Sequence, residues 1–306
     1  MRNLQVALRD PSISGRCDQD DRDFDHLSKL NSLRIGCVKY VNARPLIRGC
    51  PGDVEFDHPS ALCQRLANRE LDVALVSSFE YLRNPVYRIV DDVSISSYGP
   101  VYSVVVAYSG DISEIEQIEL DPASETSVNL LRCLLAERAL IPSLSRNIGK
   151  MPMFQALHRA RLLIGDQAIH FRQKHAGECQ FWDLGEQWKK LTGLPFVYAL
   201  WLIRPEVTGA KSLAQRLRKL RDKNLASLDD LIEEAVAGVG LSAVASAKTD
   251  EPGPRKELNR EFLFRYFCKH LRFSFGKKEK QGLQCFADLC GKHGVLPARD
   301  RPFTLV

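Results

Sequence analysis

The sequence predicts an α/β protein with two lobes, a cleft between them and a helical C-terminal part. Three observations support this prediction. Short apolar, strand-like runs alternate with amphipathic helical segments between residues 33 and 203. That alternation is typical of mostly parallel sheets whose strands are joined by crossover helices. Two long apolar runs, 101–108 and 196–203, are suited to carry the chain between the lobes, and residues 204–306 are predominantly helical in pattern.

The first lobe begins with a buried strand, because residues 33–38 are largely apolar and a turn containing Asn42 and Pro45 follows them. In the helix of this lobe, Leu62, Leu66 and Leu71 share one face. The elements predicted for the lobe are, in order, a strand at 33–38, a strand at 54–57, a helix at 59–71, a strand at 72–76 and a helix at 79–82.

The second lobe repeats the design without repeating the sequence. Residues 101–108 cross into it as a strand, and 196–203 cross back. Between them we expect strands near 115–120, 146–149 and 161–164, and helices at 128–139, 154–160, 167–174 and 185–191. The C-terminal part is predicted to hold helices at 212–237, 258–271 and 279–293, with a linker at 243–254. The predicted boundaries assign 33–104 and 204–306 to lobe 1 and 105–203 to lobe 2.

Composition excludes several classes of protein. The net charge of +5 is small and its Lys and Arg residues are scattered, which argues against a nucleic-acid partner. Nine cysteines form no CxxC pair, so free thiols in a reducing compartment are expected rather than a disulfide framework. No stretch is long and apolar enough to span a membrane.

Residues 1–32 are expected to be an extension outside the folded lobes. They contain no apolar core of the kind that a secretory signal needs, and they carry five acidic residues between positions 18 and 25. The sequence therefore predicts a cytoplasmic protein rather than an exported solute receptor.

Asn42 and Ser103 are candidate site residues. Asn42 follows the end of the first strand, where a side-chain amide could both donate and accept hydrogen bonds from a fixed position. A turn asparagine that supports its own backbone is the alternative. Ser103 lies on the first crossing strand and is expected to face the cleft.

Further hydroxyl groups lie at the starts of helices. Ser124, Thr126 and Ser127 precede a helix that has no acidic residue in its first turn from Val128 on, so its backbone N–H groups could bind a carboxylate or phosphate. Helix capping is the alternative, and the two roles are compatible. Two other strand ends carry Gly165-Asp166 and Ser77-Ser78. There the alternatives are a helix N-cap, which is usual for Asp at such a place, or a contact with substrate, which for Asp166 would be to a hydroxyl.

The sequence carries no signal for a metal or a cofactor. His170 and His175 are five residues apart, which would point them to different faces of a helix. Walker A, GxGxxG, GxSxG and HExxH motifs are absent. The expected pocket holds a small anion by hydroxyl groups, amides and backbone N–H groups. That inventory leaves two classes of function, a passive binding protein or an enzyme that works by holding its substrate.

Six segments together resemble one family, the chorismate dehydratases of menaquinone biosynthesis, over about residues 33–297. The most specific of them is Asp183-Leu184-Gly185-Glu186 followed by Thr192-Gly193-Leu194-Pro195-Phe196. The others are Ile35-Gly36 to Tyr40-x-Asn42-x-x-Pro45-Leu46, Asp72-Val73-Ala74-Leu75-Val76, Gly99-Pro100-Val101-x-Ser103, Ser124-x-Thr126-Ser127-Val128 and Leu163-Ile164-Gly165-Asp166-x-Ala168. Arg44 and Ser77-Ser78 depart from what is common at those positions.

The resemblance implies a type II periplasmic-binding-protein fold and a hydro-lyase of the futalosine route, without cofactor or metal. Chorismate would lose its 4-hydroxyl as water and give 3-[(1-carboxyvinyl)oxy]benzoate. Asn42 and Ser103 match the positions that orient or act on the substrate, and the substrate's own enolpyruvyl carboxylate would serve as the base. A binding protein of the same fold and the related 1,4-dihydroxy-6-naphthoate synthase are the alternatives, although the synthase is expected to carry a cleft histidine and a different first turn.

Overall fold

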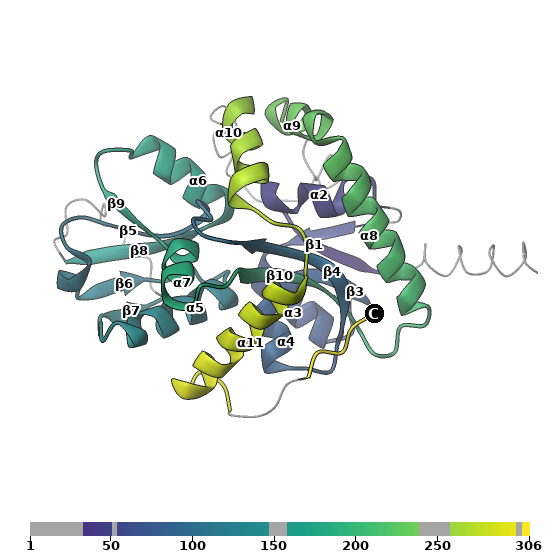
Figure 1. Ribbon diagram of the computed structural model, residues 1–306, viewed down its shortest axis with the longest axis horizontal. Coiled ribbons are helices and arrows are strands. Elements are labelled where there is room, and N and C mark those ends of the chain that lie inside the picture. The colour runs from purple at the N-terminus through teal and green to yellow at the C-terminus, as the bar shows by residue number, and fades with distance from the viewer. Residues whose placement is uncertain (1–32, 51–53, 147–157, 239–257, 298–301) are drawn as a thin grey trace, which may run out of the picture.

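The computed structural model describes residues 33–50, 54–146, 158–238, 258–297 and 302–306, which form two α/β lobes, each with its own five-stranded sheet. In Figure 1 the sheet of β5 to β9 lies at the left and that of β1 to β4 at the right. The predicted two-lobed α/β architecture is therefore confirmed.

The first sheet has the strand order β2-β1-β3-β10-β4. β1 (Ile35–Val38) pairs in parallel with β2 (Val54–Asp57) and β3 (Val73–Ser77), as crossover connections require. β10 (Phe196–Ile203) is inserted antiparallel between β3 and β4 (Arg88–Ser97). β1, β3 and β10 are buried along most of their length, which explains why they are nearly uniformly apolar.

The second sheet has the same design, with the order β7-β6-β8-β5-β9. β6 (Gln117–Glu119) pairs in parallel with β7 (Ser143–Ser145) and β8 (Arg159–Ile164). β5 (Val104–Tyr108) is antiparallel to both β8 and β9 (Gln180–Asp183). In both sheets, then, an antiparallel strand separates the parallel strands from the edge.

Helices connect the strands of each lobe and complete the C-terminal part, where α11 packs against both β10 and α5 (Figure 1). The helices of the first lobe are η1 (Val41–Ala43), α2 (Arg44–Ile47), α3 (Pro59–Ala67) and α4 (Ser78–Arg83). Those of the second are η2 (Ile112–Glu114), α5 (Glu125–Glu137), α6 (Gly165–Lys174) and α7 (Leu184–Thr192). The last are α8 (Ala210–Ala226), α9 (Leu228–Val236), α10 (Arg260–Arg265), η5 (Tyr266–His270) and α11 (Lys277–Lys292).

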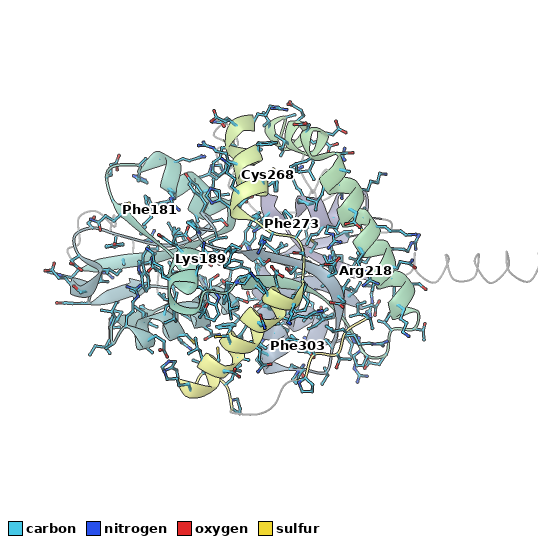
Figure 2. The ribbon with its side chains drawn as sticks, in the orientation of Figure 1. Phe181, Lys189, Arg218, Cys268, Phe273 and Phe303 are labelled. Carbon is cyan, nitrogen blue, oxygen red and sulfur yellow. The ribbon has the colours of Figure 1, made fainter. Side chains whose placement is uncertain are left out.

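The C-terminal residues return to the first lobe. Arg218 on α8 donates from Nη1 to the carbonyl oxygens of Asp91 and Val306, at 3.3 and 2.9 Å (Figure 2). The backbone of Val306 also pairs with Ile89 of β4, and the Phe303 ring packs edge-on against Tyr81. These contacts fix the last five residues against β4 and α4.

The prediction that residues 101–108 and 196–203 cross between the lobes as strands is wrong. β10 pairs with β3 and β4, so residues 196–203 lie within the first sheet, and β5 lies within the second. The chain passes between the sheets at 98–103 and 193–195, between these strands. Apolar patterning marks a buried strand, but it does not say which sheet supplies the neighbours.

Two strands escaped the sequence analysis, β4 and β9. In β4, Asp91 and Asp92 interrupt the apolar pattern, and Asp92 has a φ of +60° at an irregularity of the β10 pairing. The hydroxyls of Ser94 and Ser96 are buried in this strand, and they donate hydrogen bonds to the carbonyl oxygens of Ser274 and Arg272. Tertiary partners thus make a polar sequence acceptable in a buried strand.

Helix boundaries differ from the prediction in the C-terminal part. The predicted helix 212–237 is two helices, α8 and α9, and 258–271 is α10 followed by the π-helical turn η5. The linker 243–254 and most of the predicted strand 146–149 and helix 154–160 lie outside the described residues. Arg159 and Ala160, placed in that helix, belong to strand β8.

The carboxylate of Asp183, which is 1% exposed, fixes one of the two passages between the sheets. It accepts hydrogen bonds from the N–H groups of Val101 and Tyr102 at 3.0 and 2.8 Å. It also caps α7 by accepting from Gly185 and Glu186, at 3.1 and 3.2 Å. The passage at 98–103 is thereby bound to the start of α7.

Two glycines allow the close packing around these passages. A Cβ on Gly185 would lie 2.5 Å from the carbonyl oxygen of Gly99, and one on Gly282 of α11 would lie 2.0 Å from the carbonyl oxygen of Pro195. Both distances are well inside van der Waals contact with backbone atoms. The backbone approach therefore requires glycine at both positions.

We expect Asp183→Ala to lower the free energy of unfolding by about 3–5 kcal/mol, because it leaves several buried donors without their acceptor. Asp111→Ala is the control, since Asp111 caps η2 in an exposed position by accepting from Ser113 N at 2.8 Å. Its loss should cost about 1 kcal/mol. Urea unfolding of both variants measures the difference. Equal losses would contradict the role assigned to Asp183.

Candidate functional site

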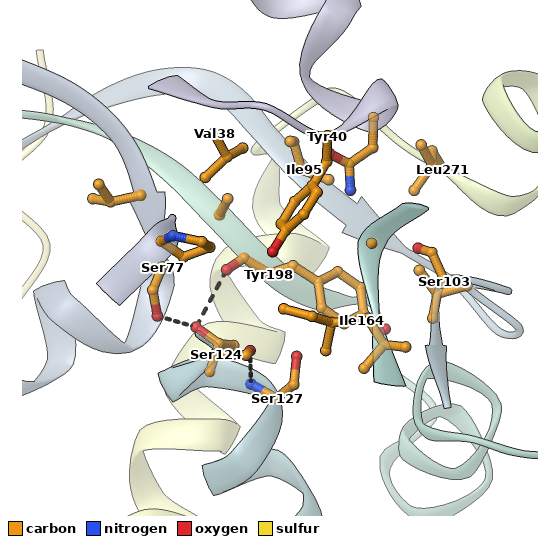
Figure 3. A pocket seen from close by; sticks show the side chains of 18 residues that line it. Val38, Tyr40, Ser77, Ile95, Ser103, Ser124, Ser127, Ile164, Tyr198 and Leu271 are labelled. Atoms are coloured by element: carbon orange, nitrogen blue, oxygen red, sulfur yellow. Dashed lines mark hydrogen bonds between the residues drawn. The ribbon is translucent and has the colours of Figure 1, made fainter. Parts of the chain in front are cut away.

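A pocket lies between the two sheets, with Ser77, Ser124 and Ser127 on one side of it and Ser103 on another (Figure 3). The apolar lining is Val38, Pro59, Val76, Ile95, Val101, Val104, Ile164, Ala199 and Leu271. The remaining lining residues are Tyr40, Asn42, Ser77, Ser103, Ser124, Thr126, Ser127, Gly165 and Tyr198. The pocket thus offers an apolar surface for a ring and a set of neutral hydrogen-bonding groups for its substituents.

The structure brings together seven of the nine site residues expected from the sequence. Those that line the pocket are Asn42, Ser77, Ser103, Ser124, Thr126, Ser127 and Gly165. They come from η1, β3, the passage at 98–103, α5 and the start of α6. Segments that are up to 123 residues apart in the chain, from position 42 to position 165, therefore face one space.

Ser78 does not line the pocket. Its side chain is fully buried, and its hydroxyl donates to the carbonyl oxygen of Val197 at 2.7 Å. The hydroxyl therefore joins the first turn of α4 to β10. Neighbouring residues at the β3–α4 junction point in different directions, and only Ser77 reaches the cavity.

Asp166 does not line the pocket either; its carboxylate joins the lobes instead. It accepts from the backbone N–H of Val41 with both oxygens, at 3.0 and 3.3 Å. Burial raises the pKa of this carboxyl to about 6, against the opposing effects of the Val41 N–H, His170 and Arg44. The group that was expected to bind substrate therefore connects α6 of one lobe to η1 of the other.

Tyr40 and Gly165 form a second contact between the lobes. Gly165 has a φ of +57°, and a Cβ there would lie 2.7–2.9 Å from the Tyr40 ring. Its N–H donates to the carbonyl oxygen of Ser103 at 2.8 Å. Glycine is required at this strand end because of both its backbone angle and the ring packed on it.

The helix beside the hydroxyl cluster starts earlier than expected. α5 begins at Glu125, so its first turn does contain an acidic residue. The Ser124 hydroxyl caps it by accepting from Ser127 N at 3.1 Å. Capping is thus confirmed for Ser124, and the Glu125 carboxylate reduces the positive potential of this helix start.

Thr126 is the third point where the lobes meet. Its Oγ1 hydrogen-bonds with the Ser77 hydroxyl, accepts from Phe79 N at 3.3 Å and donates to the carbonyl oxygen of Tyr198 at 3.3 Å. These partners belong to the first sheet and α4, whereas Thr126 belongs to α5. One hydroxyl therefore serves the interface as well as the pocket wall.

Asn42 and Ser103 lie in a buried polar cluster. Asn42 Oδ1 is buried and has no hydrogen-bond partner. Ser103, 1% exposed, accepts a hydrogen bond from the Tyr266 hydroxyl at 2.7 Å. Buried acceptors are nearly always paired, so Asn42 Oδ1 is suited to receive a donor from a bound molecule.

Three tyrosines complete this region, and the sequence analysis assigned a role to none of them. Tyr40 and Tyr198 line the pocket, and Tyr266 lies behind Ser103. Burial raises the pKa of all three phenols, so each stays protonated near neutral pH. Tyr40 lies within the family motif that runs from Ile35 to Leu46, whereas Tyr266 stands in no motif.

The described lining includes no Asp, Glu, His, Lys or Arg. Within the described part of the chain, no group of three or more His, Cys, Asp or Glu is placed to hold a metal ion. A ligand in this pocket is therefore contacted by hydroxyls, an amide and backbone groups. For an acid–base step, this lining itself offers tyrosine, serine and threonine hydroxyls, besides water and the ligand.

Comparison with known proteins fits this geometry. Residues 33–292 match the model of a family described as menaquinone biosynthesis. A chorismate dehydratase of Thermus thermophilus is 28% identical over 275 residues, which are 84% of this chain and 94% of that protein. This chain belongs to the chorismate dehydratase family. Another chorismate dehydratase, from Campylobacter jejuni, is 27% identical over 178 residues, or 58% of this chain and 65% of that protein.

Solved structures confirm the fold expected for a chorismate dehydratase. A protein of Archaeoglobus fulgidus superposes with a TM-score of 0.61 at 17% identity, covering 86% of this chain and 98% of that one. The periplasmic aliphatic sulphonate binding protein SsuA of Escherichia coli gives 0.56 at 12% identity, covering 87% and 94%. The two lobes thus have the periplasmic-binding-protein-like architecture. Of the helices described, none has the length and apolar character needed to cross a membrane.

We expect the burial of the Asp166 carboxyl to weaken the folded state as pH rises. Its folded pKa of about 6 exceeds the ordinary 3.8, so its contribution is fully present below about pH 4 and is lost as pH rises through 6. Asp166→Asn keeps an acceptor for Val41 N–H but does not titrate. The stability of wild type relative to this variant should fall by roughly 3 kcal/mol at most between pH 4 and 7.

Thermal or urea unfolding of both proteins at several pH values measures this difference. Two stability curves that stay parallel over that range would show that Asp166 does not carry the effect.

Proposed function

We propose that this protein is a chorismate dehydratase, which removes water from chorismate to give 3-[(1-carboxyvinyl)oxy]benzoate. The observation that carries the proposal is a pocket with hydroxyl and amide groups but no carboxylate, imidazole or amine in its described lining. Family membership supports chorismate as the substrate. Chorismate has a ring for the apolar lining, and two carboxylates and a hydroxyl for the polar groups.

The reaction takes a proton from C3 of the ring and releases the 4-hydroxyl as water. Loss of the C3 proton spreads negative charge into the ring carboxylate, and aromatisation then expels the hydroxide. The proton goes first to the enolpyruvyl carboxylate of the substrate, which is attached at C3 and lies within reach. It ends in the water that leaves, so atoms and charge balance without a further reactant.

The protein contributes positioning and hydrogen bonds. Ser103 orients the 4-hydroxyl and donates to it as it departs, while Asn42 Oδ1 accepts a hydrogen bond that holds the substrate. Ser124, Ser127 and Thr126 offer donors to a carboxylate. Fixing the internal base against C3 can supply several kcal/mol through effective molarity, and closed lobes exclude water from the reacting atoms.

The direct test mixes purified protein with chorismate alone and follows the ultraviolet spectrum. Replacement of the diene spectrum by that of a substituted benzoate, with mass spectrometry of the product, is the expected result. A melting-temperature shift without turnover would favour a binding protein, and no response would leave the related naphthoate synthase as the better assignment. Either outcome contradicts the proposal.

We expect Asn42→Ala and Ser103→Ala each to lower kcat by about 10²–10³-fold, since each removes a preorganised hydrogen bond at the reacting groups. Ser94→Ala is the matched control, because Ser94 is an equally buried serine whose hydroxyl donates to the carbonyl of Ser274, away from the pocket. It should change stability and leave kcat within about twofold. Full turnover by Asn42→Ala would remove Asn42 from the mechanism.

A further experiment addresses the base. The pKa of the Asp166 carboxyl is raised to about 6, and Asp166 adjoins Gly165 of the pocket lining. If the substrate supplies the base, Asp166→Asn retains kcat within about tenfold, and deuterium at C3 slows wild type and variant equally. A loss as large as that expected for Asn42→Ala would identify Asp166 as the base instead.

A further inference from the structure

Tyr266 begins the π-helical turn that ends the helical segment started by α10. The turn η5 runs from Tyr266 to His270 and follows α10 directly. A π-turn inserts one extra residue into the helical repeat and changes the direction of the side chains after it, and such turns are frequent at functional sites. Here it leaves Tyr266 fully buried and leads to Leu271, which lines the pocket.

The Tyr266 hydroxyl contacts Ser103, which the proposed function places at the departing hydroxyl. It donates to Ser103 Oγ at 2.7 Å. Asn42 also acts on the phenol and lowers its pKa, against the larger rise that burial causes. Tyr266 is not among the lining residues, so it stands behind Ser103.

The direction of the bond to Ser103 has a chemical consequence. A serine hydroxyl has one proton and can accept as well as donate. Because Ser103 Oγ accepts from Tyr266, its own proton is free to point toward the pocket. Asn42 Oδ1 has no hydrogen-bond partner and is left as an acceptor.

Aromatic packing holds the phenol ring independently of its hydroxyl. The ring of Phe262 stacks on that of Tyr266 with centroids 5.6 Å apart and planes inclined by 14°. Phe267 lies on another side at 5.8 Å. A phenylalanine at position 266 would therefore occupy the same place and lack only the oxygen.

We propose that Tyr266 is a positioning residue of the site, whose hydroxyl fixes Ser103 and turns the Ser103 proton toward the substrate. The inference rests on the proposed function, because it assigns Ser103 to the departing hydroxyl. Hydrogen bonds in a buried chain strengthen one another, so removal of the phenol oxygen weakens the bond that Ser103 donates.

The test compares Tyr266→Phe with Tyr81→Phe in the full-length protein. Tyr81 is also fully buried, and its hydroxyl donates to the carbonyl of Pro302 and accepts from Thr304 N, both at 2.9 Å. Tyr266→Phe should lower kcat for chorismate about 10–100-fold with KM within about threefold. Tyr81→Phe should lower the melting temperature and leave kcat within about twofold.

The double variant Tyr266→Phe/Ser103→Ala separates positioning from packing. If Tyr266 acts through Ser103, the double variant should be no more than about threefold slower than Ser103→Ala alone. Multiplication of the two single effects would mean independent roles and would overturn the inference. So would a Tyr266→Phe enzyme with wild-type kcat.

These results are distinct from a failure of the proposed function. Wild-type protein that turns chorismate over while Tyr266→Phe is unaffected contradicts the inference alone. Wild-type protein that leaves chorismate unchanged contradicts the proposed function and the inference together. Circular dichroism and melting curves of each variant ensure that only folded protein is compared.

Discussion

The buried carboxylate of Asp183 is the interaction on which the arrangement of the site depends. Its two oxygens accept hydrogen bonds from four backbone N–H groups. Arg172 Nη1 also donates to Oδ2 at 3.2 Å. A buried charge is tolerated only when it is satisfied in this way. Because two of the donors belong to Val101 and Tyr102, the next residue, Ser103, is fixed at the pocket. The hydrogen bond from Tyr102 N–H to Asp183 also helps to hold Tyr102 at its φ of +69°.

The contacts between the lobes lie beside the pocket. Thr126 meets Ser77 and Tyr198, Gly165 meets Tyr40, and Asp166 meets the Val41 N–H. Each of these groups lines the cavity or is next in sequence to a residue that does. Relative movement of the lobes would therefore alter the binding groups themselves. This geometry suits a protein that works by immobilising a small molecule between two rigid sheets.

Some strands of the first sheet could be predicted from the sequence and others could not. The parallel strands β1 and β3 are apolar along their length, so the sequence indicated them clearly. β4 was missed because its serines and aspartates acquire partners from distant parts of the chain, among them the 272–274 segment, α8 and α11. The site residues followed the same division. Asn42 and Ser103 lie next to recognisable strand and turn signals, while Ser78 and Asp166 face partners that local patterns do not contain.

The sequence by itself determined the α/β class, most buried strands, the family and the neutral, hydroxyl-rich character of the site. Those properties depend on residue type and short-range spacing, which are present in the chain before it folds. Only the tertiary structure decided that β10 returns to the first sheet, that Asp166 binds the opposite lobe, and that Tyr266 stands behind Ser103, 163 residues away. Contacts at such separations depend on how whole sheets and helices pack, and a π-turn leaves no mark in residue pattern.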